Sequence, residues 1–225
     1  AGGEFIIDTA GVEIENTLVR KTIFEDFFED IKEIVSASNN QNGEAAATYG
    51  FEPAKDGEDK VLASNNKGVK SSTAAMTMEL RKNSIIKFKY KVSTEASYDK
   101  LIISLNGKEL KTESGVVDWQ DFELTAEQGD KITIKYTKDS SGDRNDDTVY
   151  LKDFRAEAVY KASFTMSGDG SEAQLTVKDK NSQVMEASGE NEYLLSDGNY
   201  SYTLTRFGYE TIEGSFEISG TDKEI

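Results

Sequence analysis

The chain has 225 residues, and its 26 lysine and arginine residues against 42 aspartate and glutamate residues give a formal net charge of −16. An acidic excess of this size repels phosphate backbones and anionic lipid headgroups, so binding to nucleic acid or to a membrane surface is disfavoured. The absence of cysteine and histidine excludes disulfides, thiol nucleophiles, thiolate and imidazole metal sites and histidine-based catalytic triads.

No apolar run approaches the roughly 20 residues that would span a bilayer, so we expect no membrane insertion. The sequence begins at Ala1 without an initiator methionine or a signal-peptide core. We therefore expect a fragment of a longer parent chain that carries neighbouring modules.

The N-terminal part contains one segment with a helical period. Residues 5–18 first carry scattered apolar residues that are typical of an edge strand or a short hairpin. Over residues 22–35 the apolar side chains recur every three or four positions with acids between them, which predicts an amphipathic helix. Thr22 is the expected N-cap of this helix, and Glu25 completes a capping box. Residues 36–60 are rich in Ser, Asn, Gly and Ala, and we expect them to be mostly irregular.

The apolar face of this helix includes Phe27 and Phe28. We expect the face to pack across an open end of a β-sandwich, because six large apolar side chains should not stay exposed. The alternative is a detachable helix that docks on a partner, which makes Phe27 and Phe28 candidate ligand-binding residues.

The strongest local signal is a two-residue alternation in the middle of the chain. In residues 86–92, apolar side chains alternate with lysines, which places the apolar groups on one face of a half-buried strand. The same alternation occurs in residues 76–80, 101–105, 132–136 and 150–160. Two sheets must bury such one-sided faces against each other, so the pattern predicts a β-sandwich.

The C-terminal third starts a second cycle of short strands. Apolar alternation recurs in residues 164–166, 173–177, 193–195, 200–204 and 216–218. A segment of this length with five or six strands predicts a small immunoglobulin-like or transthyretin-like sandwich. Alternation continues through the junction near Tyr160 without a Gly, Ser or Pro spacer, so we expect the two parts to form a semi-rigid rod.

Three stretches of the central region carry a family pattern. Residues 88–101 read F-x-Y-x-x-S-x-E-x-x-Y-D-x-L, Trp119 follows, and residues 136–141 read Y-x-K-D-x-S before a closing strand. This pattern resembles the MAM-like jelly-roll modules of large secreted proteins of Gram-positive bacteria, in their cysteine-free form. The resemblance covers roughly residues 60–158 and implies a jelly-roll fold.

A second resemblance lies in the C-terminal third. An L-x-x-G-x-Y-x-Y strand entry over residues 195–202 is followed by Gly208-Tyr209 and by a G-x-F-x-I strand over residues 214–218. These features are similar to PEGA-like or carboxypeptidase-regulatory-like modules, which are strung along bacterial surface proteins. The resemblance implies a spacer and an extracellular location, on the bacterial cell surface or secreted.

The predicted fold class is therefore all-β. We expect a jelly-roll β-sandwich with one amphipathic helix at residues 1–159, and a small β-sandwich spacer domain at residues 160–225.

One loop is dense in acids that could ligate a cation. Its carboxylates are those of Asp139, Asp143, Asp146, Asp147 and Asp153. Oxygen ligands on a short loop suit a structural calcium ion, and we expect no other cofactor. The spacing does not match an EF-hand loop, and Arg144 would oppose a cation, so a solvated turn is the alternative interpretation.

Paired carboxylates also raise the possibility of glycoside hydrolysis. Glu95 and Asp99 are the best such pair, but we expect them to hold loop amides in a structural corner. The sequence contains no G-x-S-x-G, H-E-x-x-H or phosphate-binding glycine loop, so we predict that the protein is not an enzyme. Trp119, the one tryptophan, is a candidate sugar-stacking residue, although we expect it in the core.

These observations favour a non-enzymatic adhesion or recognition module that binds an extracellular host ligand, with a glycoprotein or an immunoglobulin among the candidates. The alternative is a carbohydrate-binding module appended to a secreted glycoside hydrolase.

Overall fold

The computed structural model describes residues 21–39, 48–167 and 172–225. The edge strand or hairpin predicted at residues 5–18 lies outside the described residues. Among the described residues, no helix has both the length and the apolar character needed to cross a membrane.

Strands dominate the described part of the chain. Two short 3-10 helices come first, η1 (Phe24–Phe27) and η2 (Glu29–Ile31). They are followed by β1 (Val35–Asn39), β2 (Phe51–Asp56), β3 (Asp59–Ser64), β4 (Thr73–Leu80), β5 (Ser84–Ser93), β6 (Lys100–Leu105), β7 (Lys108–Glu113), β8 (Val116–Ala126), β9 (Lys131–Thr137) and β10 (Thr148–Ala158). The last strands are β11 (Tyr160–Ser163), β12 (Gln174–Asp179), β13 (Glu192–Leu195), β14 (Gly198–Thr205), β15 (Ile212–Ile218) and β16 (Lys223–Glu224).

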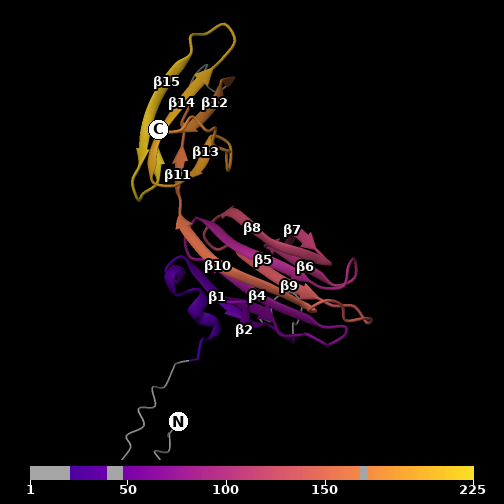
Figure 1. Cartoon of the computed structure of the whole chain (residues 1–225). Helices are drawn as coiled ribbons and strands as arrows, with labels where there is room; N and C mark the ends of the chain where they lie inside the picture. The colour runs from indigo at the N-terminus through magenta and orange to yellow at the C-terminus, as the bar shows by residue number, and fades with distance from the viewer. Residues whose placement is uncertain (1–20, 40–47, 168–171) are drawn as a thin grey trace, which may run out of the picture.

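The first ten strands form a jelly-roll β-sandwich (Figure 1). One five-stranded sheet has the order β1-β4-β9-β6-β7, and the other has the order β2-β3-β10-β5-β8. Every pairing within these two sheets is antiparallel. Between β3 and β10 the chain changes sheet at each connection except the one from β6 to β7. The all-β class that the alternation predicted is confirmed.

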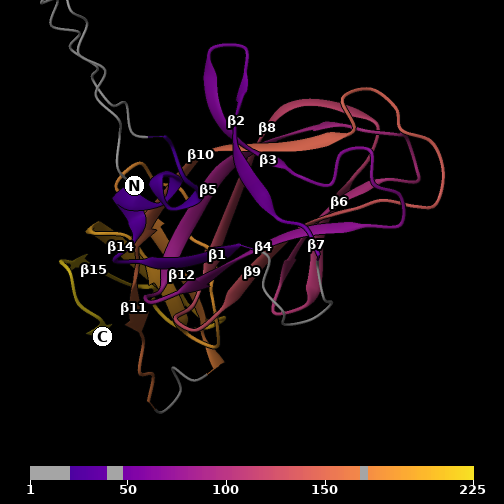
Figure 2. The ribbon, with the colours of Figure 1, turned by 90° about the horizontal axis from the view of Figure 1, so that it is seen from below.

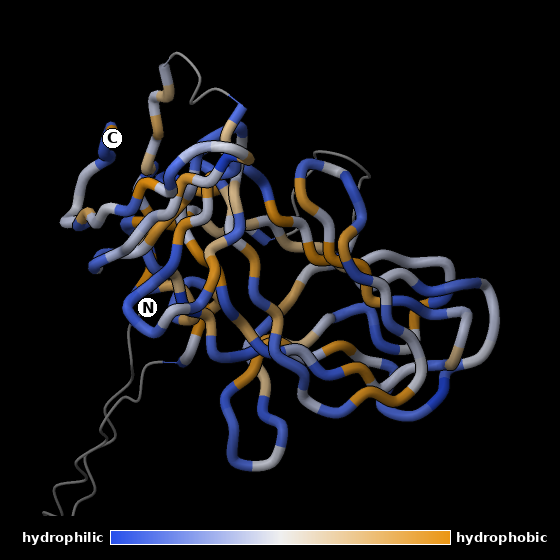
Figure 3. Tube along the Cα trace, turned by 90° about the horizontal axis from the view of Figure 1, so that it is seen from above, coloured by the Kyte–Doolittle hydropathy of each residue, from blue (hydrophilic) through white to orange (hydrophobic). Residues whose placement is uncertain are grey.

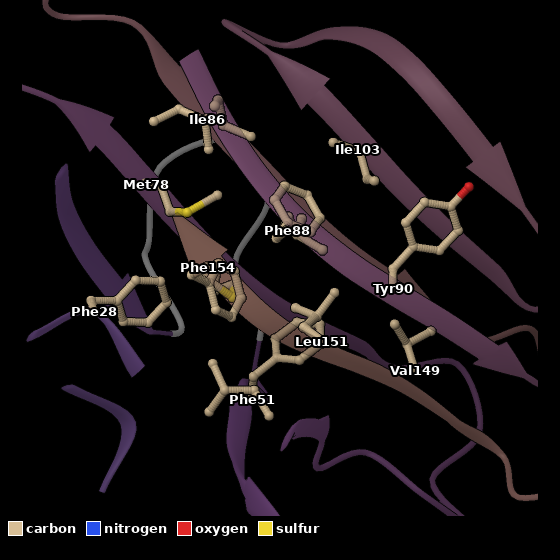
Figure 4. Packing of buried hydrophobic residues seen from close by; sticks show 14 of the residues in the cluster. Phe28, Phe51, Met78, Ile86, Phe88, Tyr90, Ile103, Val149, Leu151 and Phe154 are labelled. Carbon is tan, nitrogen blue, oxygen red and sulfur yellow. The ribbon is translucent and has the colours of Figure 1, made fainter. Parts of the chain in front are cut away.

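The core lies between the two sheets. The apolar side chains of residues 86–92 are at most 2% exposed, whereas Lys87 and Lys89 on the same strand point outward. The rings of Phe28, Phe154 and Phe88 lie in a row through this core, with centroids 4.7 and 5.5 Å apart (Figure 4). Hydrophilic residues predominate in the loops at the end of the jelly roll that lies away from the C-terminal strands (Figure 3). The period of two therefore sorts side chains between core and solvent as expected.

The predicted amphipathic helix at residues 22–35 is wrong in type. Residues of η1 and η2 make hydrogen bonds to the third residue back, such as Phe28 N–H to Glu25 O at 3.0 Å. Phe28 itself leaves the helical region with φ −117° and ψ 2°, and Val35 is already paired in β1. The expected capping by Thr22 and Glu25 is also replaced, because the Ile23 N–H donates to Asp26 Oδ2 at 2.9 Å. The segment therefore forms two single 3-10 turns instead of one regular helix.

The packing of this segment is as predicted. Phe24, Phe28 and Ile31 are 8%, 4% and 5% exposed and belong to the core of the jelly roll. The Phe28 ring lies 5.1 Å from Phe24 and 4.7 Å from Phe154. The two 3-10 turns thus cover one end of the sandwich, and the interpretation as a detachable helix is not supported.

The prediction of irregular structure over residues 36–60 is wrong. This range contains β1, β2 and the start of β3. β1 and β2 are both edge strands, and side-chain burial does not alternate along either of them, so their sequences carry no period of two. The edge position also accommodates Pro53, which has no N–H to donate to a second partner.

The C-terminal strands form a second, smaller β-sandwich. Its sheets have the orders β13-β11-β16 and β12-β14-β15. A separate hydrophobic cluster lies between them and includes Val177, Tyr200 and Phe216. At the junction, Val159 is 3% exposed and its N–H donates to Asn83 O at 2.9 Å, so no exposed spacer separates the two sandwiches.

Candidate ligand-binding face

Trp119 does not lie in the core. It is half-buried on β8, outside the hydrophobic cluster of the jelly roll. Its side chain lies on the outward side of β8 with Asp121 and Glu123, because Gln120 and Phe122 are the residues that pair with the buried Tyr90 and Phe88. A β-bulge adjoins it, since β8 pairs Gln120 with Tyr90 but Val117 with Val92, so Asp118 and Trp119 share one place in the ladder. The expectation of a core tryptophan is therefore wrong.

The outward position puts Trp119 on a face that β5, β8 and β10 share. The ammonium of Lys152 lies 4.1 Å from the centroid of the Trp119 ring. On the same face, the ammonium of Lys91 lies 5.4 Å from the centroid of Tyr150, which is also half-buried. Each aromatic ring thus has a cation over it, a contact that stabilises both groups.

The hairpin of β2 and β3 supplies acids to this face. It projects outward from the sheet (Figure 2). Asp56 pairs with Lys91 at 2.8 Å, and Asp59 pairs with Lys152. The hydrogen bond that the Lys91 ammonium donates to Asp56 raises the pKa of Lys91, so this group stays charged. We call the set the Trp119 face and define it by Asp56, Asp59, Lys91, Trp119, Tyr150 and Lys152.

The Trp119 face combines flat apolar rings with fixed polar groups. Aromatic rings of this kind offer apolar area at a low entropy cost, and their polar neighbours fix the orientation of a ligand. Lys89 and Lys87 extend the face along β5, each paired with an acid of β8, Asp121 and Glu123. The lysines that alternate along residues 86–92 are therefore each paired with an acid, which favours a neutral polyhydroxylated ligand over a polyanion.

A second polar cluster is buried at one end of the jelly roll. The side chain of Lys138 is 0% exposed, and its Nζ donates to Asp143 Oδ1 at 2.8 Å and to Asp147 Oδ2. The hydroxyl of Tyr136 donates to Asp147 Oδ1 at 2.8 Å and to Asp99 Oδ2 at 3.4 Å. We call these five residues the Lys138 cluster. They tie the loop before β10 to the ends of β6 and β9.

Burial and charge shift the titration of this cluster in several directions. Burial raises the pKa of Tyr136 far above its usual range, and the neighbouring Asp147 adds to the effect. Burial also raises the pKa of Asp99, against the opposing influence of the Asp139 amide. The hydrogen bond from Lys138 lowers the pKa of Asp143. Burial lowers the pKa of Lys138 itself, but the hydrogen bonds to its two aspartates outweigh burial and leave the pKa raised.

The aspartates predicted as metal ligands do not surround a common point, and two of them contact Lys138 instead. Asp143 and Asp147 both contact Lys138, while the Asp139 carboxylate accepts the N–H of Ser141 at 2.7 Å. Asp146 joins the loop to β5 through its N–H, which donates to the Ser93 hydroxyl. Asp153 lies apart on β10. Within the described residues no group of three or more acids could hold a metal ion, so calcium binding by this loop stays a prediction.

Glu95 and Asp99, the acids considered as a catalytic pair, both contact the loop between β9 and β10. Asp99 is 0% exposed, and its Oδ1 accepts the N–H of Asp139 at 3.0 Å. Glu95 packs against Gly142, where an added Cβ would lie 3.1 Å from Glu95 Oε2. Asp99 thus holds a loop amide, as the sequence suggested, whereas Glu95 only packs against the loop. Glu95 Oε2 is buried without a hydrogen-bond partner, a position that a water can satisfy.

The two phenylalanine candidates have different environments. Phe28 is a core residue, 4% exposed. Phe27 is half-buried and lines an open pocket of about 500 Å³ together with Asp26, Lys60 and Asp153. Of the three aromatic candidates, Trp119 and Phe27 are thus accessible to a ligand and Phe28 is not.

Sequence reasoning missed most of the Trp119 face. The alternation in residues 150–160 predicts Tyr150 on the apolar face with Lys152 as the one break, and this is wrong for Tyr150. Val149 and Leu151 are the core residues at this end of β10, and a register shift between Lys152 and Arg155 changes the inward side of the strand. The approach of Tyr150 and Lys152 to Trp119 could not have been predicted, because it depends on the order of three strands in the sheet.

No family model matches the sequence, and no curated protein matches it either. The resemblances to MAM-like and PEGA-like modules therefore stay predictions. Several solved structures are similar to the chain at low sequence identity.

One is the secreted serine protease VesC from Vibrio cholerae, with a TM-score of 0.37 and 16% identity over 48% of this chain and 24% of that chain. Another is the adhesin domain of Epf from Streptococcus pyogenes, with a TM-score of 0.30 and 8% identity over 78% of this chain and 81% of that one. A third is the CBM36-1 domain of a multidomain xylanase from the hindgut metagenome of Trinervitermes trinervoides, with a TM-score of 0.28 and 10% identity over 53% and 97%. The chain thus spans about a quarter of the length of the protease.

Proposed function

We propose that this chain is a non-catalytic recognition module that binds an extracellular glycan through the Trp119 face. The glycan is carried either by a host glycoprotein, as in an adhesin, or by a polysaccharide, as in a module appended to a secreted hydrolase. The small sandwich at residues 160–225 acts as a spacer in this proposal.

The observation that carries the proposal is the outward position of Trp119. A lone tryptophan that leaves the core of a jelly roll exposes a large apolar ring to water unless something covers it. Here the Lys152 ammonium lies over the ring and also pairs with Asp59, so a ligand must pack on the ring beside this lysine or displace it. Tyr150 and the ion pairs of Asp56 and Asp59 supply further flat and polar surface beside it.

The Trp119 face is better suited to binding a glycan than to binding the surface of another protein. Protein interfaces usually have a desolvated apolar centre, whereas the Trp119 face is crossed by ion pairs that need water or hydroxyl groups around them. Sugar hydroxyls can bond the outer oxygens of these carboxylates, while the C–H groups of a sugar ring pack on the aromatic rings.

The absence of catalysis is part of the same proposal. The buried acids of the Lys138 cluster, Asp99 and Asp147, are paired with a lysine, a tyrosine and a loop amide. The extracellular setting is also proposed, and it is supported by the two sequence resemblances to modules of bacterial surface proteins.

A glycan array with the purified chain tests the proposal. Trp119→Ala should weaken every sugar-competable interaction about tenfold or more, which corresponds to about 1.4 kcal/mol. The melting temperature should stay within a few degrees of the original, because Trp119 is outside the core. Phe207→Ala is the matched control, since Phe207 is fully exposed on the other sandwich and its loss should change neither property.

Enzymatic deglycosylation separates the glycan from the protein that carries it. Binding to a host glycoprotein should disappear after its glycans are removed. Binding that persists on the deglycosylated protein, or that is insensitive to Trp119→Ala, would contradict the proposal.

A further inference from the structure

The Lys138 cluster holds an amine and a carboxyl in contact, out of reach of water. The side chains of Lys138 and Asp147 are 0% and 3% exposed, and Lys138 Nζ contacts Asp147 Oδ2. A buried ion pair carries a large desolvation cost for both charges. Condensation to an amide removes both charges and releases one water, and proximity of the two groups greatly accelerates such a step.

The oxygens of Asp147 are held in a way that assists this step. The N–H of Gly68 donates to Asp147 Oδ2 at 2.6 Å, and the hydroxyl of Tyr136 donates to Asp147 Oδ1 at 2.8 Å. Donors fixed on both oxygens stabilise the negative charge that develops when an amine attacks the carboxyl carbon.

Two further acids are placed to move protons. Asp143 accepts a hydrogen bond from Lys138 Nζ at 2.8 Å at the solvent edge of the cluster, where it is 42% exposed. Asp99 is 0% exposed and reaches Asp147 Oδ1 through the hydroxyl of Tyr136, which donates to Asp99 Oδ2 at 3.4 Å. The reacting pair is thus flanked by one acid near the nitrogen and one near the oxygen.

We propose that Lys138 and Asp147 form an intramolecular amide crosslink between Nζ and Cγ. The Nζ–Cγ bond forms and the Cγ–Oδ1 bond breaks. Of the three protons on the ammonium, one stays on the amide nitrogen, and the other two are carried by Asp143 and by the Asp99–Tyr136 pair to the departing oxygen. The products are the amide and one water, so no oxidant, reductant or other reactant is needed. Oδ2 becomes the amide oxygen and keeps its hydrogen bond from Gly68.

Intact-mass spectrometry of the purified, folded protein tests the crosslink directly. The expected mass is the sequence mass minus one water. After digestion with trypsin, the segment through Lys138 should appear as one branched peptide joined to the segment that contains Asp147, with no cleavage after Lys138. A mass equal to that of the sequence, with free cleavage after Lys138, overturns the proposal.

Three variants test whether Lys138 supplies the amine and whether Asp99 assists the condensation. Lys138→Arg keeps the positive charge but cannot condense, so its mass should equal its own sequence mass. Asp99→Asn keeps the acceptor for the Asp139 amide and should leave the pair wholly or largely uncondensed. Lys91→Arg changes a half-exposed, ion-paired lysine of the Trp119 face and should still lose one water. Loss of water in Lys138→Arg would assign the crosslink elsewhere and overturn the proposal, and these mass measurements do not depend on ligand binding.

Discussion

At the scale of single residues, the Lys138 cluster shows how one buried cation organises several acids. Four titratable groups surround the Lys138 ammonium or its partners, and each has its own hydrogen bonds. Removing the lysine leaves Asp147 buried beside Asp99 without a counter-charge.

Lys138→Met should therefore destabilise the jelly roll by about 3 to 5 kcal/mol, because it leaves the Asp147 carboxylate buried without its partner, whether the original pair is joined by ions or by the proposed amide. Denaturant unfolding at neutral pH measures this difference. Lys89→Met is the control, because Lys89 and Asp121 form an exposed pair at 3.5 Å and their loss should cost less than about 1 kcal/mol. An equal loss of unfolding free energy in the two variants would show that burial of Lys138 beside Asp147 does not stabilise the jelly roll.

The raised pKa of Tyr136 predicts that the free energy of unfolding falls at alkaline pH. Its pKa is raised in the folded protein, so the folded state keeps a proton that the unfolded chain releases as the pH rises above about 10. The stability that Tyr136 contributes is thus fully present below pH 10 and is lost above it, by about 1.4 kcal/mol per pH unit.

Tyr136→Phe removes this dependence together with the hydrogen bond to Asp147. The difference in unfolding free energy between the original protein and the variant should be largest below pH 10 and should shrink at pH 11. Urea unfolding at pH 8, 10 and 11 measures it. A difference that is constant over this range would mean that Tyr136 ionises in the folded protein.

At the scale of secondary-structure elements, the segment before β1 determines how the end of the sandwich is closed. Its two 3-10 turns place Phe28 in the aromatic row of the core, while the neighbouring Phe27 stays half-buried at the edge of a pocket. Adjacent residues of the same type thus have unequal burial.

Phe28→Ala should cost about 3 to 5 kcal/mol of stability, as expected for a large aromatic side chain removed from a core. Phe27→Ala should cost about 1 kcal/mol, because much of that ring is already in contact with water. Thermal unfolding followed by circular dichroism compares the two. A larger loss for Phe27→Ala would contradict the packing described for this segment.

The elements also show which features of the fold the sequence could predict. Strands with alternating lysines, such as residues 86–92, were predictable because a period of two sorts core from solvent. Residues 22–35 were not, since the same spacing of phenylalanines fits an α-helix and two 3-10 turns, and only the pairing of Val35 with Leu80 decides between them. The edge strands in residues 36–60 lack a pattern because side-chain burial does not alternate along them.

The same reasoning applies to the candidate site. The residue types were visible in the sequence, and Trp119 was singled out because it is the one tryptophan. Its outward direction follows the alternation of Phe122 and Leu124 with Asp121 and Glu123, but the bulge at Asp118 and Trp119 puts Val117 on the core side, and this change of side hides the pattern in the sequence.

At the scale of the whole molecule, the described residues contain two hydrophobic clusters that share no residue. We propose on this basis that residues up to 159 and residues 160–225 are two folding units joined by a tight junction. Phe216→Ala should then lower the melting temperature of the small unit only, and Phe88→Ala that of the jelly roll only. Differential scanning calorimetry should show two transitions, of which each variant shifts one. A single transition that both variants shift equally would mean that the chain folds as one unit.

Glycan recognition through the Trp119 face is the central claim, and the fluorescence of Trp119 tests it most directly. The chain has a single tryptophan, so its emission reports on this face alone. Titration with a glycan selected on the array should change the intensity or wavelength of the emission and should saturate at the concentration at which binding saturates. Saturable binding of that glycan without any change in the emission of Trp119 would place the ligand elsewhere on the molecule and contradict the claim.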